Sequence, residues 1–509
     1  MSLAKSYSAQ LVGLTCDIVT IEVDITNGLH SFSIVGLGDR AVEEAKDRIS
    51  AAIKNIGYTS PKQKNQKVTL SLAPADMRKE GPSFDVAMAI AYLTAVGEFD
   101  FNHSIMERTI FLGELSLDGS IRKVPGILPI LCQIKSLGFD IAYIPFENSK
   151  EASLAQGITI FAVHSLREVI AHISDTSLLE PLTHKKPCDT VAAPYTYDMC
   201  SIRGNETAKR GLEIAAAGAH NVILSGPPGT GKTMLAQTFC SILPDLTYEH
   251  SLEVMSIYSA ARLLDGQLLE RAPFRAPHHT ASYPAIIGGG SFPKPGEITL
   301  AHRGVLFLDE FPEFDRSVIE ALRQPLEERT ITISRVRGSV TFPAQCILIA
   351  SMNPCPCGLG KELGCTCPEG IVNSYKRRIS GPIIDRIDVW LSSTKIDYEK
   401  LSLRNTPTEN SETMRIRVIA ARALQKHRFQ KKGLSISYNS EMTAQNIELC
   451  TDMTDDARST LRISAEKMSL SGRAFHRVIK VAQTIADLAG IEIIQKDFIL
   501  EALQYRKKG

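Results

Sequence analysis

The sequence predicts an α/β protein with a parallel β-sheet in the middle portion of the chain. Three short apolar runs, at 221–225, 305–308 and 347–352, have the composition of strands buried on both faces. Segments with helical periodicity separate these runs, as in a parallel sheet with helices on its faces. The chain has 509 residues, 44% of them hydrophobic and 22% charged, which is enough for two to four globular domains.

The bulk composition limits the possible partners. The net charge is only +1, so any site for a polyanion must come from a local cluster of basic residues. The longest apolar stretch, 86–96, is too short to cross a bilayer, and the N-terminus lacks the basic and apolar segments of a signal peptide. We therefore expect a cytoplasmic protein with no membrane partner.

Changes in residue pattern divide the chain into four segments. Residues 1–173 alternate strand-like and helical patterns and should form an α/β or α+β domain. Residues 174–197 are polar, contain prolines and lack periodicity, which is typical of a linker. Residues 198–395 contain the parallel sheet, and residues 396–509, with long helical patterns at 414–429 and 471–489, should form a helical lid.

The most informative motif directly follows the first apolar run. It has the glycine spacing of a phosphate-binding loop and leads into helix-forming residues. The motif consists of Gly226, Pro227, Pro228, Gly229, Thr230, Gly231, Lys232 and Thr233. In such a loop the backbone N–H groups face the phosphates, Lys232 adds a positive charge, and the Thr233 hydroxyl can bind Mg²⁺. The motif predicts that the chain binds ATP with Mg²⁺.

Polar residues follow the other two apolar runs. Asp309 and Glu310 come directly after the run at 305–308, where Asp309 would hold Mg²⁺ through water and Glu310 would orient the attacking water. Asn353 follows the run at 347–352, the place where additional-strand ATPases carry a first sensor for the γ-phosphate. A lone Asn at a strand end is more often a turn former, so its assignment depends on the other two motifs.

The order of these motifs resembles the AAA+ ATPases of the Mg-chelatase-like ComM/YifB group. The segments that carry the resemblance, besides the phosphate loop, are 296–304 (GEITLAHRG), Asn353-Pro354 and 380–388 (SGPIIDRID). The resemblance runs nearly from end to end. It implies an N-terminal domain like that of Lon proteases with a ribosomal S5-like fold, an AAA+ P-loop core and a C-terminal helical lid. It also implies a ring, usually a hexamer, with ATP at the subunit interfaces.

Two arginines acquire roles through this resemblance. Arg386 would be the arginine finger that acts on the neighbouring subunit, and Arg473 the second sensor on the lid. A surface ion pair of Arg386 with Asp385 or Asp388 is the alternative. Arg477 lies one turn further along the same helix face and is a second candidate for the sensor.

Two insertions are candidates for contact with the substrate of the motor. The segment 274–291 is rich in glycine, proline and imidazole rings, and 330–342 reads as a hairpin with Arg335 and Arg337 near its tip. In related ring ATPases, which include the replicative MCM helicases, such insertions project into the pore. By resemblance, Arg335, Arg337 and Lys294 would contact DNA phosphates, and a solvated hairpin with ordinary surface arginines is the alternative.

Four cysteines lie close together in the sequence. They are Cys355, Cys357, Cys365 and Cys367. In a cytosolic chain, four thiols in thirteen residues favour a tetrahedral zinc site beside the first sensor. The C-x-C spacing is less common than C-x₂-C, and a metal-free loop is the alternative.

The N-terminal segment resembles a peptidase that has lost its general base. Ser83, in the run 79–83, falls where Lon-type peptidases have their nucleophile. A gapless comparison with the Lon pattern places Ile130 where those enzymes have the lysine that takes the serine proton. Lys135, five residues on, would point elsewhere from a helix. We therefore expect no peptidase activity.

Together these features predict a Mg²⁺-dependent ATPase that acts as a hexameric DNA helicase. The family resemblance implies branch migration during natural transformation and homologous recombination, with single-stranded and branched DNA and recombination proteins as candidate partners. A Mg-chelatase-like motor that remodels a protein complex is the principal alternative. An ATP-dependent protease is a third interpretation, which Ile130 disfavours.

Overall fold

The computed structural model divides into two compact units. The first combines 1–191 with 248–269, and the second combines 192–247 with 270–509. The residues described are 2–63, 65–98, 103–184, 195–264, 269–290, 293–335, 338–360, 364–394 and 409–507. Within this part of the chain, no helix is both long enough and apolar enough to span a bilayer.

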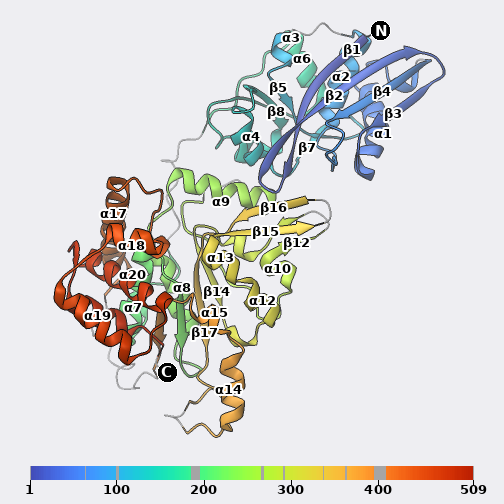
Figure 1. Ribbon diagram of the computed structural model, residues 1–509. Coiled ribbons are helices and arrows are strands. Elements are labelled where there is room, and N and C mark those ends of the chain that lie inside the picture. Colours follow the sequence, from blue (N-terminus) through green and yellow to red (C-terminus); the bar gives the residue numbers. More distant parts are fainter. Residues whose placement is uncertain are drawn as a thin grey trace. The chain divides into compact units, whose positions relative to one another are not determined.

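A four-stranded sheet forms one part of the first unit (Figure 1). Its strands, in the spatial order β1-β2-β4-β3, are β1 (Ser2–Val12), β2 (Thr15–Asn27), β4 (Gln66–Ala73) and β3 (Ser31–Val35). Only the β3–β4 pair is parallel. The helices α1 (Arg40–Asn55) and α2 (Asp85–Val96) contribute to the same apolar core, and α2 is buried around nearly its whole circumference. The alternation of strand-like and helical patterns expected within residues 1–173 is thus confirmed for these elements.

The rest of the first unit is built on a smaller, parallel sheet. Its strands, in spatial order, are β5 (Thr109–Phe111), β8 (Ile141–Pro145) and β9 (Thr159–Val163). The remaining elements before residue 174 are α3 (His103–Met106), β6 (Glu114–Leu115), β7 (Ile121–Arg122), α4 (Ile127–Ile134), α5 (Ser149–Ala152) and α6 (Leu166–Ile173). Helix α4 lies in a second apolar cluster, which includes Ile130.

Helix α9 (Tyr248–Ala260) belongs to the first unit, although we placed its residues in the segment 198–395. Met255 is fully buried in the apolar cluster of α4. The Tyr248 hydroxyl donates to the Leu154 carbonyl (2.6 Å), and the Ser259 hydroxyl donates to Glu151 Oε2 (2.6 Å). A segment that follows the phosphate loop in sequence therefore completes the core of the N-terminal unit.

A five-stranded sheet, parallel throughout, organises the second unit, which confirms the expected parallel sheet. In spatial order its strands are β11 (Phe274–Arg275), β14 (Val305–Leu308), β17 (Ile347–Met352), β10 (Val222–Ser225) and β18 (Val389–Ser392). Strands β14 and β17 are buried at every position, which explains their continuous apolar sequence. Because all five strands run in one direction, their carboxyl ends share one edge.

Short helices and two hairpins surround this sheet. The helices are α7 (Glu206–Gly218), α8 (Lys232–Phe239), α10 (Tyr283–Ile287), α11 (Glu297–Leu300), α12 (Arg316–Ala321), α13 (Arg323–Glu328), α14 (Glu369–Arg377) and α15 (Gly381–Ile384). The predicted hairpin is present as β15 (Thr330–Arg335) and β16 (Gly338–Pro343), and a smaller one joins β12 (Gly288–Gly289) to β13 (Lys294–Pro295).

The C-terminal segment is mainly helical. Its elements are α17 (Ser411–Lys431), α18 (Ala444–Cys450), β19 (Asp452–Met453), α19 (Asp455–Lys467), α20 (Gly472–Leu488), β20 (Ile493–Ile494) and α21 (Lys496–Gln504). A buried polar contact joins it to the sheet, because His220 lies 2.9 Å from the Thr484 hydroxyl and 3.3 Å from Asp388 Oδ2. Burial alone would raise the pKa of Asp388, but Arg477 and His220 outweigh it and hold that pKa well below its usual range.

Candidate functional site

The phosphate loop connects β10 to α8, as the motif predicts. Gly229 and Gly231 adopt φ values of 75° and 80°, which favour glycine. Gly226 is required for a different reason, because a Cβ there would lie 2.2 Å from the Ser393 hydroxyl oxygen. Ser393, just beyond β18, also contacts the Thr230 hydroxyl at 2.7 Å and so supports the loop from behind.

Lys232 at the start of α8 has its ammonium group held by three oxygens. Its Nζ donates to the carbonyls of Gly226 (2.7 Å) and Pro227 (2.9 Å) and to Asn353 Oδ1 (3.1 Å). Burial lowers the pKa of Lys232, and the nearby carboxylates of Asp309 and Glu310 partly oppose this effect. The lysine predicted from the loop and the asparagine predicted from β17 therefore meet.

The residues predicted to hold Mg²⁺ also converge. The Thr233 hydroxyl donates to Asp309 Oδ2 at 3.1 Å. Asp309 Oδ1 accepts a short hydrogen bond from the Ser351 hydroxyl, which comes from the neighbouring strand β17. A hydroxyl and a carboxylate at this spacing, beside a phosphate loop, suit a hydrated Mg²⁺.

Glu310 follows β14 in an unusual backbone conformation. Its φ is 51°, in the left-handed region, and its N–H donates to the Ser351 hydroxyl at 3.1 Å. Its carboxylate lies 3.4 Å from His279 Nδ1. His279 belongs to the insertion 274–291, so this insertion reaches the residue expected to orient the attacking water.

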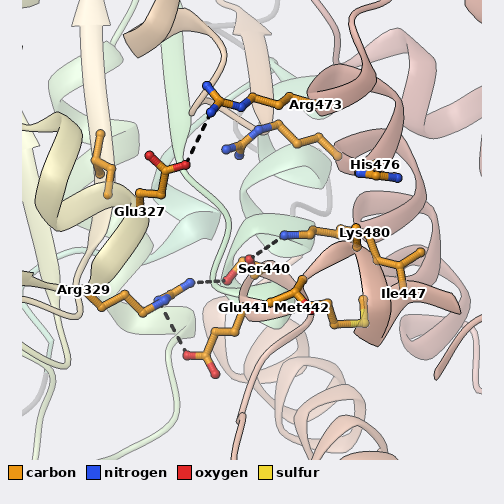
Figure 2. Close-up of a pocket in the computed structure, with 13 residues that line it drawn as sticks. Glu327, Arg329, Ser440, Glu441, Met442, Ile447, Arg473, His476 and Lys480 are labelled. Carbon is orange, nitrogen blue, oxygen red and sulfur yellow. Dashed lines mark hydrogen bonds and ion pairs between the residues drawn. The ribbon is translucent and has the colours of Figure 1, made fainter. Parts of the chain in front are cut away.

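The predicted arginine finger, Arg386, and the predicted second sensor, Arg473, both face one carboxylate, Glu327, which is neither of the two considered for Arg386 from the sequence. Arg386 forms a short ion pair with Glu327 of α13 and donates to the Pro382 carbonyl at 2.7 Å. Arg473 at the start of α20 also faces Glu327, with Nη2 3.8 Å from Oε1 (Figure 2). Arg477, the second candidate for the sensor, instead forms a short ion pair with buried Asp388.

The four cysteines predicted to bind zinc lie together after β17. Their sulfur atoms lie within 4.8 Å of one another. The Sγ–Sγ distances are 3.3 Å for Cys355–Cys357, 3.5 Å for Cys357–Cys365 and 3.4 Å for Cys355–Cys365. Tetrahedral zinc, with Zn–S bonds of about 2.3 Å, would require about 3.8 Å between sulfurs.

The thiolate chemistry of this cluster also suits zinc. The Leu359 N–H and then the thiols of Cys355 and Cys367 lower the pKa of Cys357 to about 6. For Cys365 the Cys367 N–H lowers the pKa, but burial and the thiols of Cys355 and Cys357 outweigh it and raise the pKa to about 12, so the two thiols share their protons unequally. A low thiol pKa favours the thiolate form, which is the form that binds metals. The donor set therefore fits a structural Zn²⁺ held by all four cysteines.

The residues predicted to contact DNA are only partly described. Lys294 is exposed on β13, in the small hairpin of the first insertion. The backbone of Arg335 ends β15, but its side chain and the whole of Arg337 lie outside the described residues. The site therefore gives the position of the hairpin and of Lys294 but not the arrangement of the two arginines.

The N-terminal residues compared with Lon peptidases lie in the first unit. Ile130 is 3% exposed and packs in the apolar cluster of α4. The Ser83 carbonyl accepts a hydrogen bond from the Gly113 N–H at 3.0 Å. An apolar side chain thus occupies the position where the family comparison would place a general base.

Three residues that contact the candidate site were missed from the sequence. They are Ser351, Ser393 and Glu327. Ser351 left a weak signal, since it is a hydroxyl residue within an apolar strand that ends at the site. Ser393 and Glu327 left none, because only the tertiary fold brings them to the phosphate loop and to the arginines.

The loop, the acidic residues after β14 and the asparagine after β17 define a P-loop nucleotide-binding site of the AAA+ type. Three family models match the chain. They are magnesium chelatase, subunit ChlI, at 198–401; subunit ChlI of Mg-chelatase at 21–148; and the ChlI C-terminal region at 408–506.

Full-length relatives identify the family. The chain is 39% identical over 511 residues to the competence protein ComM of Haemophilus influenzae, covering 99% of this chain and 98% of that protein. It is 40% identical over 510 residues to the uncharacterized protein YifB of Escherichia coli, covering 99% and 97%. The chain belongs to the ComM/YifB family of Mg-chelatase-like AAA+ proteins, and this membership indicates an ATPase that uses ATP and Mg²⁺.

Two further relatives match only part of the chain. Lon protease 2 of Bacillus subtilis is 32% identical over 187 residues, which cover 33% of this chain and 32% of that protein. The DNA replication licensing factor mcm7-B of Xenopus laevis is 22% identical over 315 residues, which cover 60% of this chain and 38% of that protein.

Proposed function

We propose that this chain is a ring-forming, Mg²⁺-dependent DNA translocase that drives branch migration. The observation that supports this most directly is the convergence of Lys232, Asn353 and Asp309 at the carboxyl edge of one parallel sheet. That arrangement suits ATP hydrolysis, in which catalysis consists mainly of positioning and electrostatic stabilisation. Arg386 and Arg473 would then complete the site of a neighbouring copy, most simply in a hexamer.

DNA is the substrate that the accessory features favour. A hairpin carrying Arg335 and Arg337 and a second carrying the exposed Lys294 would bind phosphates without regard to sequence. The name of the ComM relative supports a role in natural transformation, and the partial match to a replication factor supports a DNA substrate. Branched recombination intermediates would be the natural substrate of such a motor.

The N-terminal unit would serve as a scaffold of Lon-like, S5-like fold without peptidase activity, because Ile130 replaces the general base. The four-cysteine cluster would hold Zn²⁺ and fix the loop that follows Asn353. Neither part would take a direct role in hydrolysis.

A two-part experiment tests this function. ATP turnover is measured with and without single-stranded DNA, and branch migration is measured on a synthetic mobile four-way junction. We expect DNA to stimulate turnover, and the Arg335→Ala/Arg337→Ala variant to lose stimulation while keeping basal turnover. A control variant, Arg462→Ala/Lys467→Ala on α19, makes the same change in charge away from the hairpin and should behave like the unmodified chain.

A motor that remodels a protein complex is the alternative. It would hydrolyse ATP with the same loop but would neither bind DNA nor respond to it. Basal ATP turnover without DNA binding would therefore favour the remodelling motor over the translocase.

A further inference from the structure

The feature that carries a further inference is a single carboxylate shared by two arginines. Glu327 Oε2 pairs with Arg386. Glu327 Oε1 faces Arg473 Nη2 at 3.8 Å, as Figure 2 shows. The two guanidinium groups thus approach different oxygens of the same group. The arginines come from separate elements, one after α15 and the other at the start of α20.

Glu327, Arg386 and Arg473 form a triad whose surroundings are rich in positive charge. Two further arginines nearby have carboxylates of their own, since Arg477 pairs with Asp388, and Arg329 lies 3.5 Å from Glu441. A cavity of about 310 Å³ is lined by the charged side chains of Glu327, Arg329, Glu441, Arg473, Arg477 and Lys480. Among the described residues, Glu327 is the one carboxylate paired with both Arg386 and Arg473, and the cluster retains unbalanced positive charge that favours an anion.

Glu327 and Arg473 are accessible to solvent, whereas Arg386 is nearly buried. Arg473 is 61% exposed and Glu327 is 53% exposed, whereas Arg386 is only 10% exposed. The Arg386 Nε atom is buried and has no hydrogen-bond partner among the described residues. A buried guanidinium N–H without an acceptor is costly, so Arg386 has a hydrogen-bond donor that an incoming anion could satisfy.

Contacts at the C-terminal end of α13 fix the position of Glu327. Helix α13 ends at Arg329, whose φ of 58° is in the left-handed region. Arg329 donates to the Ser440 hydroxyl at 3.2 Å and faces Glu441, so this contact ties the end of α13 to the C-terminal segment. Glu327, two residues earlier, is thereby held beside α20.

We propose that Glu327 is an internal counter-ion that holds Arg386 and Arg473 together and is exchanged for the triphosphate of a neighbouring copy. A carboxylate and a terminal phosphate offer similar oxygens to guanidinium groups, and arginine binds both in the same geometry. The triphosphate carries more charge, so it displaces the carboxylate when a second copy brings it to this face. Glu327 is thus a positioning residue, and its role rests on the proposed ring ATPase.

The exchange has a consequence for kinetics. Each turnover requires the two arginines to leave Glu327 before they engage ATP, so the carboxylate weakens apparent ATP binding. Glu327→Gln removes the charge but keeps the shape of the side chain. We expect this variant to lower the KM for ATP roughly two- to fivefold, the range for a partly exposed ion pair, and to change kcat less than KM.

Matched variants separate this role from a structural one. Glu328→Gln removes the adjacent carboxylate charge and should leave KM unchanged. In the described part of the chain, the Glu328 carboxylate accepts a hydrogen bond from Gln324. Glu327→Asp keeps the charge and should keep the higher KM. In an Arg473→Ala background the effect of Glu327→Gln on KM should shrink, because one of the two exchanged cations is gone.

The experiment is steady-state ATP turnover over a range of ATP concentrations, with thermal unfolding of each variant. The counter-ion role of Glu327 is wrong if folded Glu327→Gln has an unchanged or raised KM, or if Glu328→Gln shows the same fall in KM. Either result leaves the proposed ATPase activity unaffected. If Glu327→Gln unfolds, Glu327→Ser repeats the test at this exposed position. If the unmodified chain does not hydrolyse ATP, the proposed function itself fails, and the exchange fails with it.

Discussion

Lys232 and Asn353 contact each other directly, with the lysine Nζ 3.1 Å from the asparagine Oδ1. The two residues are 121 positions apart in the sequence, and parallel pairing of β10 with β17 brings them together. The contact places both the charge and the amide beside the phosphate-binding loop. Groups held in place before the substrate arrives contribute most to stabilising a transition state.

The first prediction concerns this asparagine. Asn353→Ala removes an amide that would contact the γ-phosphate or the attacking water, so we expect kcat to fall about 10²- to 10³-fold. Nucleotide affinity should change much less, because the loop and Lys232 remain. Steady-state turnover and binding of a fluorescent ATP analogue check this split. Asn446→Ala, at a half-buried position of α18, is the control, and an equal loss of affinity and rate would contradict the prediction.

The second prediction concerns Ser351. Its hydroxyl bonds both Asp309 Oδ1 and the Glu310 N–H, so it orients the carboxylate expected to hold Mg²⁺. Loss of such an outer partner typically costs about 10- to 100-fold in metal affinity or activity. Ser351→Ala should therefore shift the Mg²⁺ concentration that gives half-maximal turnover upward by about tenfold. Ser459→Ala on α19 should leave the Mg²⁺ curve in place, and an unshifted curve for Ser351→Ala would refute the role.

The sequence predicts the part of the site that depends on strand ends. Asp309 and Asn353 follow apolar runs that read as parallel strands, and parallel strands bring their carboxyl ends to one edge. Glu327 could not be found in this way, because its contacts depend on how α13 packs beside Arg386, which follows α15, and beside Arg473 at the start of α20. The sequence also could not show that α9 belongs to the first unit, because an apolar residue such as Met255 does not indicate which core it packs in.

The third prediction follows from α9. Met255 is fully buried in the cluster of α4, and a Met→Ala change in a core costs about 2–5 kcal/mol. Met255→Ala should therefore destabilise the first unit selectively and speed amide exchange in α4 more than in β10 or β17. Hydrogen exchange followed by mass spectrometry measures both. Met468→Ala, at a 41% exposed position, is the control, and uniform acceleration in both units would count against this assignment.

The fourth prediction tests the zinc ligands. Purified protein should contain about one zinc per chain, and Cys365→Ser should release it, because three thiolates bind zinc less tightly than four. Elemental analysis and the melting temperature in the presence of a chelator give the readout. Cys200→Ser, at an exposed cysteine outside the cluster, should keep its zinc. Stoichiometric zinc in Cys365→Ser, or no zinc in the unmodified chain, would contradict the assignment of these four cysteines as zinc ligands.

The last prediction uses the pH dependence of stability. Burial lowers the pKa of Lys480 from 10.5 to about 8, although Asp388 opposes the effect. Above about pH 8 the folded chain loses this proton while the unfolded chain keeps it up to about pH 10.5, so unfolding takes up a proton and stability rises with pH in that window.

Lys480→Met has no such proton, so the free energy of unfolding of the unmodified chain should gain on that of the variant between pH 8 and 10.5, by at most about 3 kcal/mol. Urea unfolding at matched pH values measures the difference. Lys496→Met, at the start of α21, is the control and should show no such gain. A difference that stays constant across this window would mean that Lys480 titrates normally in the folded chain, and that the cavity it lines does not withhold water from its ammonium group.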